Sequence, residues 1–231
     1  MGEVISLDKR RRARAVSRDG HGSASRGPAA PRLSTTFWFD LASPSTYFAA
    51  ERADRVFPAL SWRPVLSGPG LAPSSLPMGA HDIALRTASA RAAELRMPLV
   101  WPESYPAAGR AAMRVATFAA ERSQASAFVL AASRLAFCGG FDLDDPEILG
   151  EAAAAASLPL DECLRAAGDR SRDAAMEAAG RQLVAQGADR LPVFRVGHRL
   201  FCGEERIAEA AAATRDPLAE RRAVPRNEFA G

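Results

Sequence analysis

Residues 35–48 read TTFWFDLASPSTYF. An aromatic, apolar run stops at Asp40, and Ser43 followed by Pro44 is typical of the first residues of a helix. A Ser43 hydroxyl at a strand-to-helix junction lies beside free backbone N–H groups and the positive end of the helix dipole, a place that favours an anion or a thiolate. The same residues also fit an ordinary helix cap, worth about 1 kcal/mol, so both roles stay open here.

The pattern around this junction predicts a β-α-β unit. We expect a strand over 35–40, a helix over 44–55 that ends before Pro58, and a second strand over 60–65 with period-two alternation. Residues 66–77, rich in Pro and Gly, form a loop of a length that often lines a site.

Helical patterns fill the next hundred residues, broken by short Pro and Gly segments, at 83–95, 107–123, 125–137, 146–156, 160–167 and 172–186. Two apolar runs then flank Gly197-His198, which predicts a hairpin with strands over 191–196 and 199–201, followed by a helix over 204–213. The order β-α-β, helices, β-β-α predicts an α/β fold, namely a thioredoxin-like domain with a large all-helical insertion between its two halves.

The domain division follows from this order. Residues 1–33 are predicted to be a disordered basic tail, and 215–231 a polar C-terminal tail. The thioredoxin-like domain takes 34–77 and 187–214, and the inserted helical subdomain takes 78–186.

Charge excludes a basic nucleic-acid platform. The chain has 30 basic and 27 acidic residues, but residues 1–34 hold 8 of the former and 3 of the latter, which leaves 22 against 24, or −2. The cysteines Cys138, Cys163 and Cys202 are far apart, which argues against a disulfide framework, a redox dithiol or a metal site. Without an export signal or a long apolar run, we expect a cytoplasmic protein that binds neither nucleic acid nor membrane.

Three motifs, in order, resemble one family. They are FDLASPSTY at 39–47, LPVFRV at 191–196 and FCGEERI at 201–207. They are similar to motifs of the glutathione-dependent 2-hydroxychromene-2-carboxylate isomerases, which are related to kappa-class glutathione transferases within the DsbA-like thioredoxin group. Ser43 stands where a redox relative has its first cysteine.

The resemblance implies an isomerase of aromatic-compound catabolism that uses glutathione, or another low-molecular-weight thiol, as a catalytic cofactor. Ser43 would donate a hydrogen bond to the thiolate and lower the pKa of the thiol. A cis peptide between Leu191 and Pro192 would present backbone to a peptide-like cofactor. The remaining cofactor-binding residues would open the last helix and hold the γ-glutamyl end: Gly203, Glu204, Glu205 and Arg206. The substrate would be a small aromatic molecule, and a homodimer is left open.

The sequence departs from the family at the cofactor site. The Asn and Lys that family members carry after the second strand are missing, and the candidates there are Ser74, Ser75, His81 and Arg86. Cys202 replaces a usual Trp, and it fits a small buried side chain better than a reactive thiol. Two alternatives therefore stand beside the isomerase: a kappa-like transferase that consumes the thiol, and a non-catalytic DsbA- or thioredoxin-like binding domain. Ser43 and Thr46 disfavour a dithiol oxidoreductase.

Overall fold

The computed structural model describes residues 34–66, 68–71, 81–102 and 109–215, all of which fall within one structural unit. The predicted basic tail and almost all of the predicted C-terminal tail lie outside the described residues. Within the described ranges, no helix is long and apolar enough to cross a membrane.

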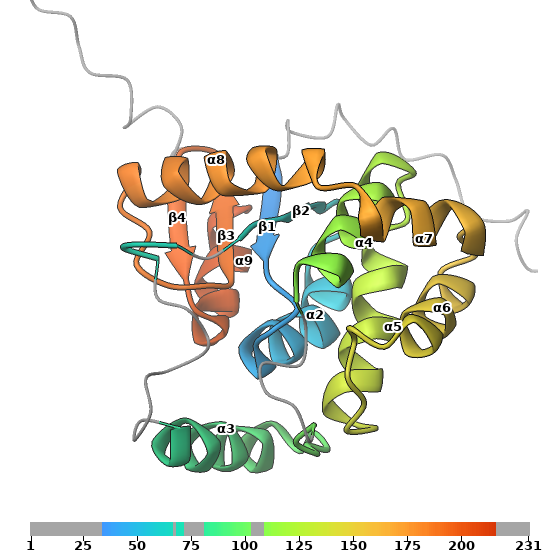
Figure 1. Cartoon of the computed structure of the whole chain (residues 1–231). Helices are drawn as coiled ribbons and strands as arrows, with labels where there is room; N and C mark the ends of the chain where they lie inside the picture. The colour runs from blue at the N-terminus through green and yellow to red at the C-terminus, as the bar shows by residue number, and fades with distance from the viewer. Residues whose placement is uncertain (1–33, 67, 72–80, 103–108, 216–231) are drawn as a thin grey trace, which may run out of the picture. The chain divides into compact units, whose positions relative to one another are not determined.

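The centre of the structure is a four-stranded mixed sheet in the order β2-β1-β3-β4 (Figure 1). Strands β1 (Thr35–Phe39) and β2 (Ser61–Pro64) are parallel, and helix α2 (Pro44–Val56) connects them. Strands β3 (Val193–Val196) and β4 (Arg199–Cys202) form an antiparallel hairpin, and β3 pairs antiparallel with β1. The predicted β-α-β unit and hairpin are both confirmed.

Aromatic side chains hold the middle of the sheet. Phe37 of β1 stacks on Phe194 of β3 at a centroid distance of 4.8 Å, and it meets Trp62 of β2 edge-on, also at 4.8 Å. Phe37 and Phe194 are fully buried. Such pairs contribute about 1 kcal/mol each beyond the area that they bury, so these three strands are fixed to one another.

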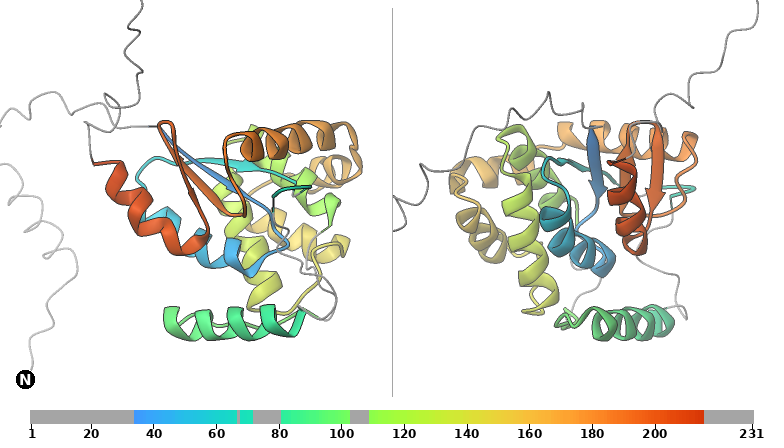
Figure 2. Two further views of the ribbon diagram at one scale, coloured as in Figure 1. Left: turned by 90° about the vertical axis from the view of Figure 1, so that its left-hand side faces the viewer. Right: turned by 180° about the vertical axis from the view of Figure 1, so that it is seen from behind.

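Helices cover both faces of the sheet. Helices α2 and α9 (Ile207–Ala213) pack on one face, and α8 (Ser171–Ala185) covers the other, as the two opposite views show (Figures 1 and 2). Beneath α8, Leu183 packs in one apolar cluster with Val65 and Val193. The helix that the sequence placed in the insertion thus forms a layer of the sheet domain.

Between β2 and α8 the described residues include five helices, α3 (His81–Leu95), α4 (Arg110–Glu121), α5 (Ala125–Phe137), α6 (Pro146–Ala155) and α7 (Leu160–Gly168). Helix α5 packs against α2, and α4 packs against β2 and α7. The predicted fold class is therefore confirmed: an α/β thioredoxin-like domain with a helical insertion. The predicted domain boundaries stay predictions, and residue 77 lies outside the described ranges.

Several boundaries differ from expectation by one to three residues, among them those of the last helix and of β2. The predicted helix over 204–213 begins as a 3-10 turn, η1 (Glu204–Arg206), before α9 takes over. Strand β2 ends at Pro64 rather than at Val65, although the Val65 N–H still donates to the Phe39 carbonyl at 2.9 Å.

Candidate functional site

Ser43 is the N-cap of α2, as predicted. Its Oγ accepts a hydrogen bond from the Ser45 N–H at 3.1 Å, and its carbonyl accepts from the Thr46 N–H at 3.1 Å. The backbone at Ser43 is extended (φ −112°, ψ 132°), and Pro44 occupies the first turn because its missing N–H costs nothing there. The cap role considered from the sequence is thus confirmed.

Among the described residues, the Ser43 hydroxyl finds no acceptor for its proton. Ser43 is only 2% exposed, and no described residue accepts its hydroxyl proton. A buried donor without an acceptor costs about 1–3 kcal/mol, and a bound acceptor would remove that cost. The arrangement therefore allows Ser43 to donate to a ligand atom while it still caps the helix.

Backbone and side-chain contacts fix the junction that carries Ser43. The Leu41 N–H donates to Sδ of Met113 in α4 at 3.3 Å, so the inserted helices reach the end of β1. Asp40 is buried and accepts from the Thr46 hydroxyl at 3.5 Å. Ser43 thus belongs to a segment held from both sides.

The second predicted segment is the Leu191–Pro192 peptide, which is cis, as the resemblance implied. Both residues are buried. The Pro192 carbonyl accepts a hydrogen bond from the Gly203 N–H at 2.8 Å. The structure therefore brings together two of the three predicted site segments.

Gly203 has a φ of +93°, a conformation that side chains rarely adopt. An added Cβ would also meet the carboxylate of Glu205, which is the flexible end of a side chain and can move away, so the requirement rests on φ. A glycine is required where β4 turns into η1, and this requirement is independent of any ligand.

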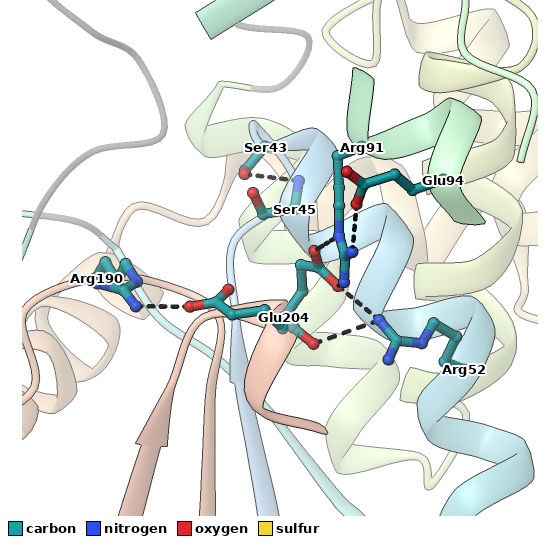
Figure 3. A network of polar contacts seen from close by, with 8 residues as sticks. Ser43, Ser45, Arg52, Arg91, Glu94, Arg190 and Glu204 are labelled. Carbon is teal, nitrogen blue, oxygen red and sulfur yellow. Dashed lines mark hydrogen bonds and ion pairs between the residues drawn. The ribbon is translucent and has the colours of Figure 1, made fainter. Parts of the chain in front are cut away.

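Glu204 is a buried carboxylate held by two arginines (Figure 3). Its Oε2 lies 2.6 Å from Nη1 of Arg52 in α2, and both of its oxygens are bonded by Arg91 in α3, one of them at 3.3 Å. Arg91 also pairs with Glu94 at 2.7 Å. The hydrogen bonds that Arg91 donates to Glu204 raise the pKa of Arg91, so this guanidinium stays charged.

The other two charged residues of the predicted site form exposed ion pairs. Glu205 pairs with Arg190, just before the cis peptide, at 2.6 Å, and Arg206 pairs with Glu209 at 2.5 Å. To bind Glu204 or Glu205, a cofactor ammonium group would have to displace the arginine that is paired with it. This displacement is easier at the exposed Glu205 than at the buried Glu204.

The place of Ser43 relative to these groups follows from α2 and from the register of the sheet. No hydrogen bond joins Ser43 to another predicted site residue within the described ranges. Arg52, through which the Glu204 network reaches α2, lies nine residues after Ser43, or about 13 Å along the helix axis. The Glu204 network thus lies further along α2, whereas the cis peptide lies at the same end of the sheet as Ser43, because Trp38 of β1 pairs with Val193, the residue after Pro192.

Solved structures share this architecture. The structure of 2-hydroxychromene-2-carboxylate isomerase matches with a TM-score of 0.64 and 16% identity over 83% of this chain and 98% of that one. A probable DsbA oxidoreductase from Streptomyces coelicolor matches at 0.61 and 20% identity, over 79% and 88% of the two chains. A putative protein disulfide isomerase from Nitrosomonas europaea matches at 0.61 and 15% identity, over 81% and 98%.

The chain has a DsbA-like thioredoxin fold. The resemblance read from the three motifs is confirmed at the level of this fold. No family model matches the sequence, and a search of curated proteins finds no significant match.

In this DsbA-like fold, the described cysteines do not supply a dithiol at the start of α2. Positions 43 and 46 hold Ser43 and Thr46, and Cys138, Cys163 and Cys202 are all free. Burial raises the pKa of the Cys202 thiol, which opposes thiolate formation near the hairpin. Partial burial of Cys202 therefore favours its protonated form.

Tyr47, one turn into α2, has a structural role. Its hydroxyl lies 3.1 Å from the carbonyl of Pro98 and 3.1 Å from Sγ of Cys138, and it donates to the carbonyl. Burial, followed by the bond to Cys138, raises the pKa of Tyr47. The aromatic residue of the first motif therefore fastens α2 to α5 and to the segment after α3.

Of the other candidates after β2, the structure describes the side chain of Arg86. Arg86 is exposed on α3, and Ser74, Ser75 and the side chain of His81 lie outside the described residues. Sequence reasoning missed Arg52 and Arg91, since each lies on a helix more than 100 residues before Glu204 in the chain. A buried acid at a helix start was the one available signal, because such an acid needs a cationic partner.

Proposed function

We propose that the protein is a thiol-dependent isomerase of the 2-hydroxychromene-2-carboxylate isomerase type, with glutathione or another low-molecular-weight thiol as a catalytic cofactor. The observation that carries the proposal is Ser43: a buried hydroxyl at the N-terminus of α2, with a proton that no described residue accepts. The fold shared with 2-hydroxychromene-2-carboxylate isomerase supports it.

In the proposed site, the Ser43 hydroxyl donates to the sulfur, and the dipole of α2 adds to this effect. Both stabilise the thiolate over the thiol and lower the pKa of the cofactor. The backbone at Leu191–Pro192 and the start of η1 at Gly203 would hold the peptide-like part of the cofactor. Glu205 and Arg206 are exposed and would contact its charged end, whereas Glu204 acts through the orientation of η1.

The reaction would conserve all atoms of the thiol. The thiolate adds to the β-carbon of an α,β-unsaturated aryl pyruvate, and the electron pair of the double bond moves to the carbonyl as an enolate. Rotation about the new single bond follows. Elimination re-forms the double bond in the other geometry and returns the thiolate, so no oxidant or reductant is needed.

The test is turnover of 2-hydroxychromene-2-carboxylate with glutathione, followed by absorbance. We expect Ser43→Ala to lower kcat/KM about a hundredfold, as for the loss of one donor to a developing anion. Asp145→Ala, which removes the side-chain cap of α6, is the matched control and should keep full activity. Unchanged turnover in Ser43→Ala would refute the assignment.

The amount of thiol consumed separates the two enzymatic alternatives. An isomerase leaves glutathione intact after many turnovers, whereas a kappa-like transferase consumes one thiol for each product. If calorimetry finds no saturable binding of glutathione, cysteine or another small thiol, the non-catalytic binding domain replaces both.

A further inference from the structure

Helix α3 lies at the end of the sheet that carries the proposed thiol site. Strand β1 ends there and leads to Ser43, and β4 ends there and leads to η1. The views in Figures 1 and 2 agree that α3 runs across this end, next to the first turns of α2. Helix α3 therefore lies over the end of the sheet where Ser43, the cis peptide and η1 are found.

The packing of α3 on the rest of the structure is slight. Of its described side chains, at 84–95, Ala92 is the one that is buried. Ala88 and Leu95 are half-buried and pack against the main core. Because few apolar side chains of α3 leave the solvent, the free energy that holds this helix in place by packing is small.

Arg91 provides a charged attachment for α3. Its guanidinium donates to both carboxylate oxygens of Glu204 in η1 (Figure 3). Glu204 is buried, whereas the side chain of Arg91 is 30% exposed. Removing a cation from a buried carboxylate costs more than breaking an ion pair at the surface. Arg91 therefore adds to the weak packing of α3 a specific link to η1.

A second arginine allows this link to open. Nη1 of Arg52 in α2 lies 2.6 Å from Oε2 of Glu204 and 3.4 Å from the Glu204 carbonyl. When Arg91 withdraws, Arg52 still compensates the charge of Glu204. Arg91 keeps Glu94, its neighbour on α3 at 2.7 Å. Since both charges retain a partner, the cost of detaching α3 from η1 is reduced.

The segment after α3 is held independently of this link. The hydroxyl of Tyr47, one turn after Ser43, donates to the carbonyl of Pro98 at 3.1 Å. The Val100 N–H donates to the carbonyl of Phe137 in α5 at 2.7 Å. The chain that follows α3 is therefore fastened to α2 and α5, and the contact between α3 and η1 can break while these bonds hold.

We propose that α3 is a gate over the thiol site and that Arg91 is the latch that holds it closed. With the latch closed, α3 covers the end of the sheet that carries Ser43, and with the latch open a ligand reaches that end. The identity of this ligand, the thiol cofactor, rests on the proposed function, whereas the motion of α3 does not. Arg91 is a positioning residue, because it acts through Glu204 and α3.

Hydrogen exchange of the full chain, measured by mass spectrometry, tests the latch. Arg91→Gln should speed the exchange of the α3 amides about tenfold, as for the loss of a charged hydrogen bond, and should leave the amides of β3 unchanged. Arg52→Gln is the matched control. It also leaves Glu204 with one arginine, but α3 keeps its contact and should exchange as in the natural chain. Unchanged α3 exchange in Arg91→Gln, or equal acceleration in both variants, would overturn the proposal.

Stopped-flow fluorescence with glutathione tests the gate. Arg91→Gln should raise the association and dissociation rate constants together, about threefold or more, because a closed gate slows both steps, and Arg52→Gln should change neither. If glutathione binds at the same rates in Arg91→Gln and in the natural chain, α3 is not a gate. If no variant binds glutathione while α3 exchange still depends on Arg91, the proposed function fails and the latch is supported.

Discussion

Nη1 of Arg52 lies 2.6 Å from Oε2 of Glu204, although 152 residues separate the two in the chain. Glu204 is 5% exposed, whereas the side chains of Arg52 and Arg91 keep about 30% of their surface in solvent. Glu204 is therefore a buried carboxylate that contacts two partly hydrated guanidinium groups. These contacts hold η1 against α2 and α3.

We expect Glu204→Gln to lower the free energy of unfolding by about 2 kcal/mol, because an amide cannot match the charge of two arginines. Urea denaturation measures this. Glu205→Gln, which affects an exposed pair with Arg190, should cost less than about 1 kcal/mol. If the two variants lost the same free energy of unfolding, the burial of Glu204 would add nothing to the stability that its ion pairs provide.

Ser43→Ala should cost stability as well as activity, through loss of the bond from the Ser45 N–H. The expected loss is about 1 kcal/mol, or a melting temperature lower by about 2–4 °C for a chain of this size. Asp145→Ala removes the bond from the Glu147 N–H and should cost the same. Calorimetric melting of both variants shows whether the two caps are equivalent; a much larger loss in Ser43→Ala would point to a folding defect.

Because of Asp173, the free energy of unfolding should depend on pH in the acidic range. Arg114 of α4 is 8% exposed, and its Nε and Nη2 each donate to one carboxylate oxygen of Asp173 at 2.7 Å. These hydrogen bonds from Arg114 lower the pKa of Asp173. Because this pKa is lower in the folded state, the pair stabilises the fold above the unfolded value of about 3.9, and the contribution is lost as the pH falls through the folded pKa.

Denaturation at a series of pH values measures this effect. Asp173→Asn should lose about 2 kcal/mol at pH 7 and less below pH 4, so its curve converges on that of the natural chain in acid. Glu177→Gln, at an exposed pair with Arg110, should run parallel to the natural chain. Parallel curves for Asp173→Asn would contradict the prediction.

Cys202 should react slowly with alkylating reagents at pH 7, because burial raises its pKa and only the thiolate attacks. Labelling with iodoacetamide, followed by mass spectrometry, should show its rate rising as the pH is raised from 7 into the alkaline range. Cys163, 1% exposed and also with a pKa raised by burial, should stay unlabelled until the protein unfolds. Rapid modification of Cys202 at neutral pH would identify it as a reactive thiol instead.

Local patterns predicted the elements well. The helix over 125–137 matches α5 residue for residue, and Gly197-His198 forms the turn of the hairpin. These elements depend on contacts between near neighbours in the chain. The spacing of apolar residues and the residues of a turn indicate such contacts directly.

Contacts between distant residues could not be read in this way. The ion pair between Arg91 and Glu204 spans 113 residues, and no local pattern distinguishes Arg91 from the other members of a set of 30 basic side chains. The place of α8 over the sheet was missed for a related reason. An Ala-rich helix with Leu183 on its buried side has the same sequence pattern whether it packs on other helices or on a sheet.

The bond between Arg114 and Asp173 links α4 of the insertion to α8, which covers the sheet. Since α8 belongs to the sheet domain by packing, the helical insertion cannot melt while the sheet remains intact without breaking this bond. Unfolding should therefore be a single cooperative transition, in which amide protons of α4 and of β3 exchange with solvent at the same free energy.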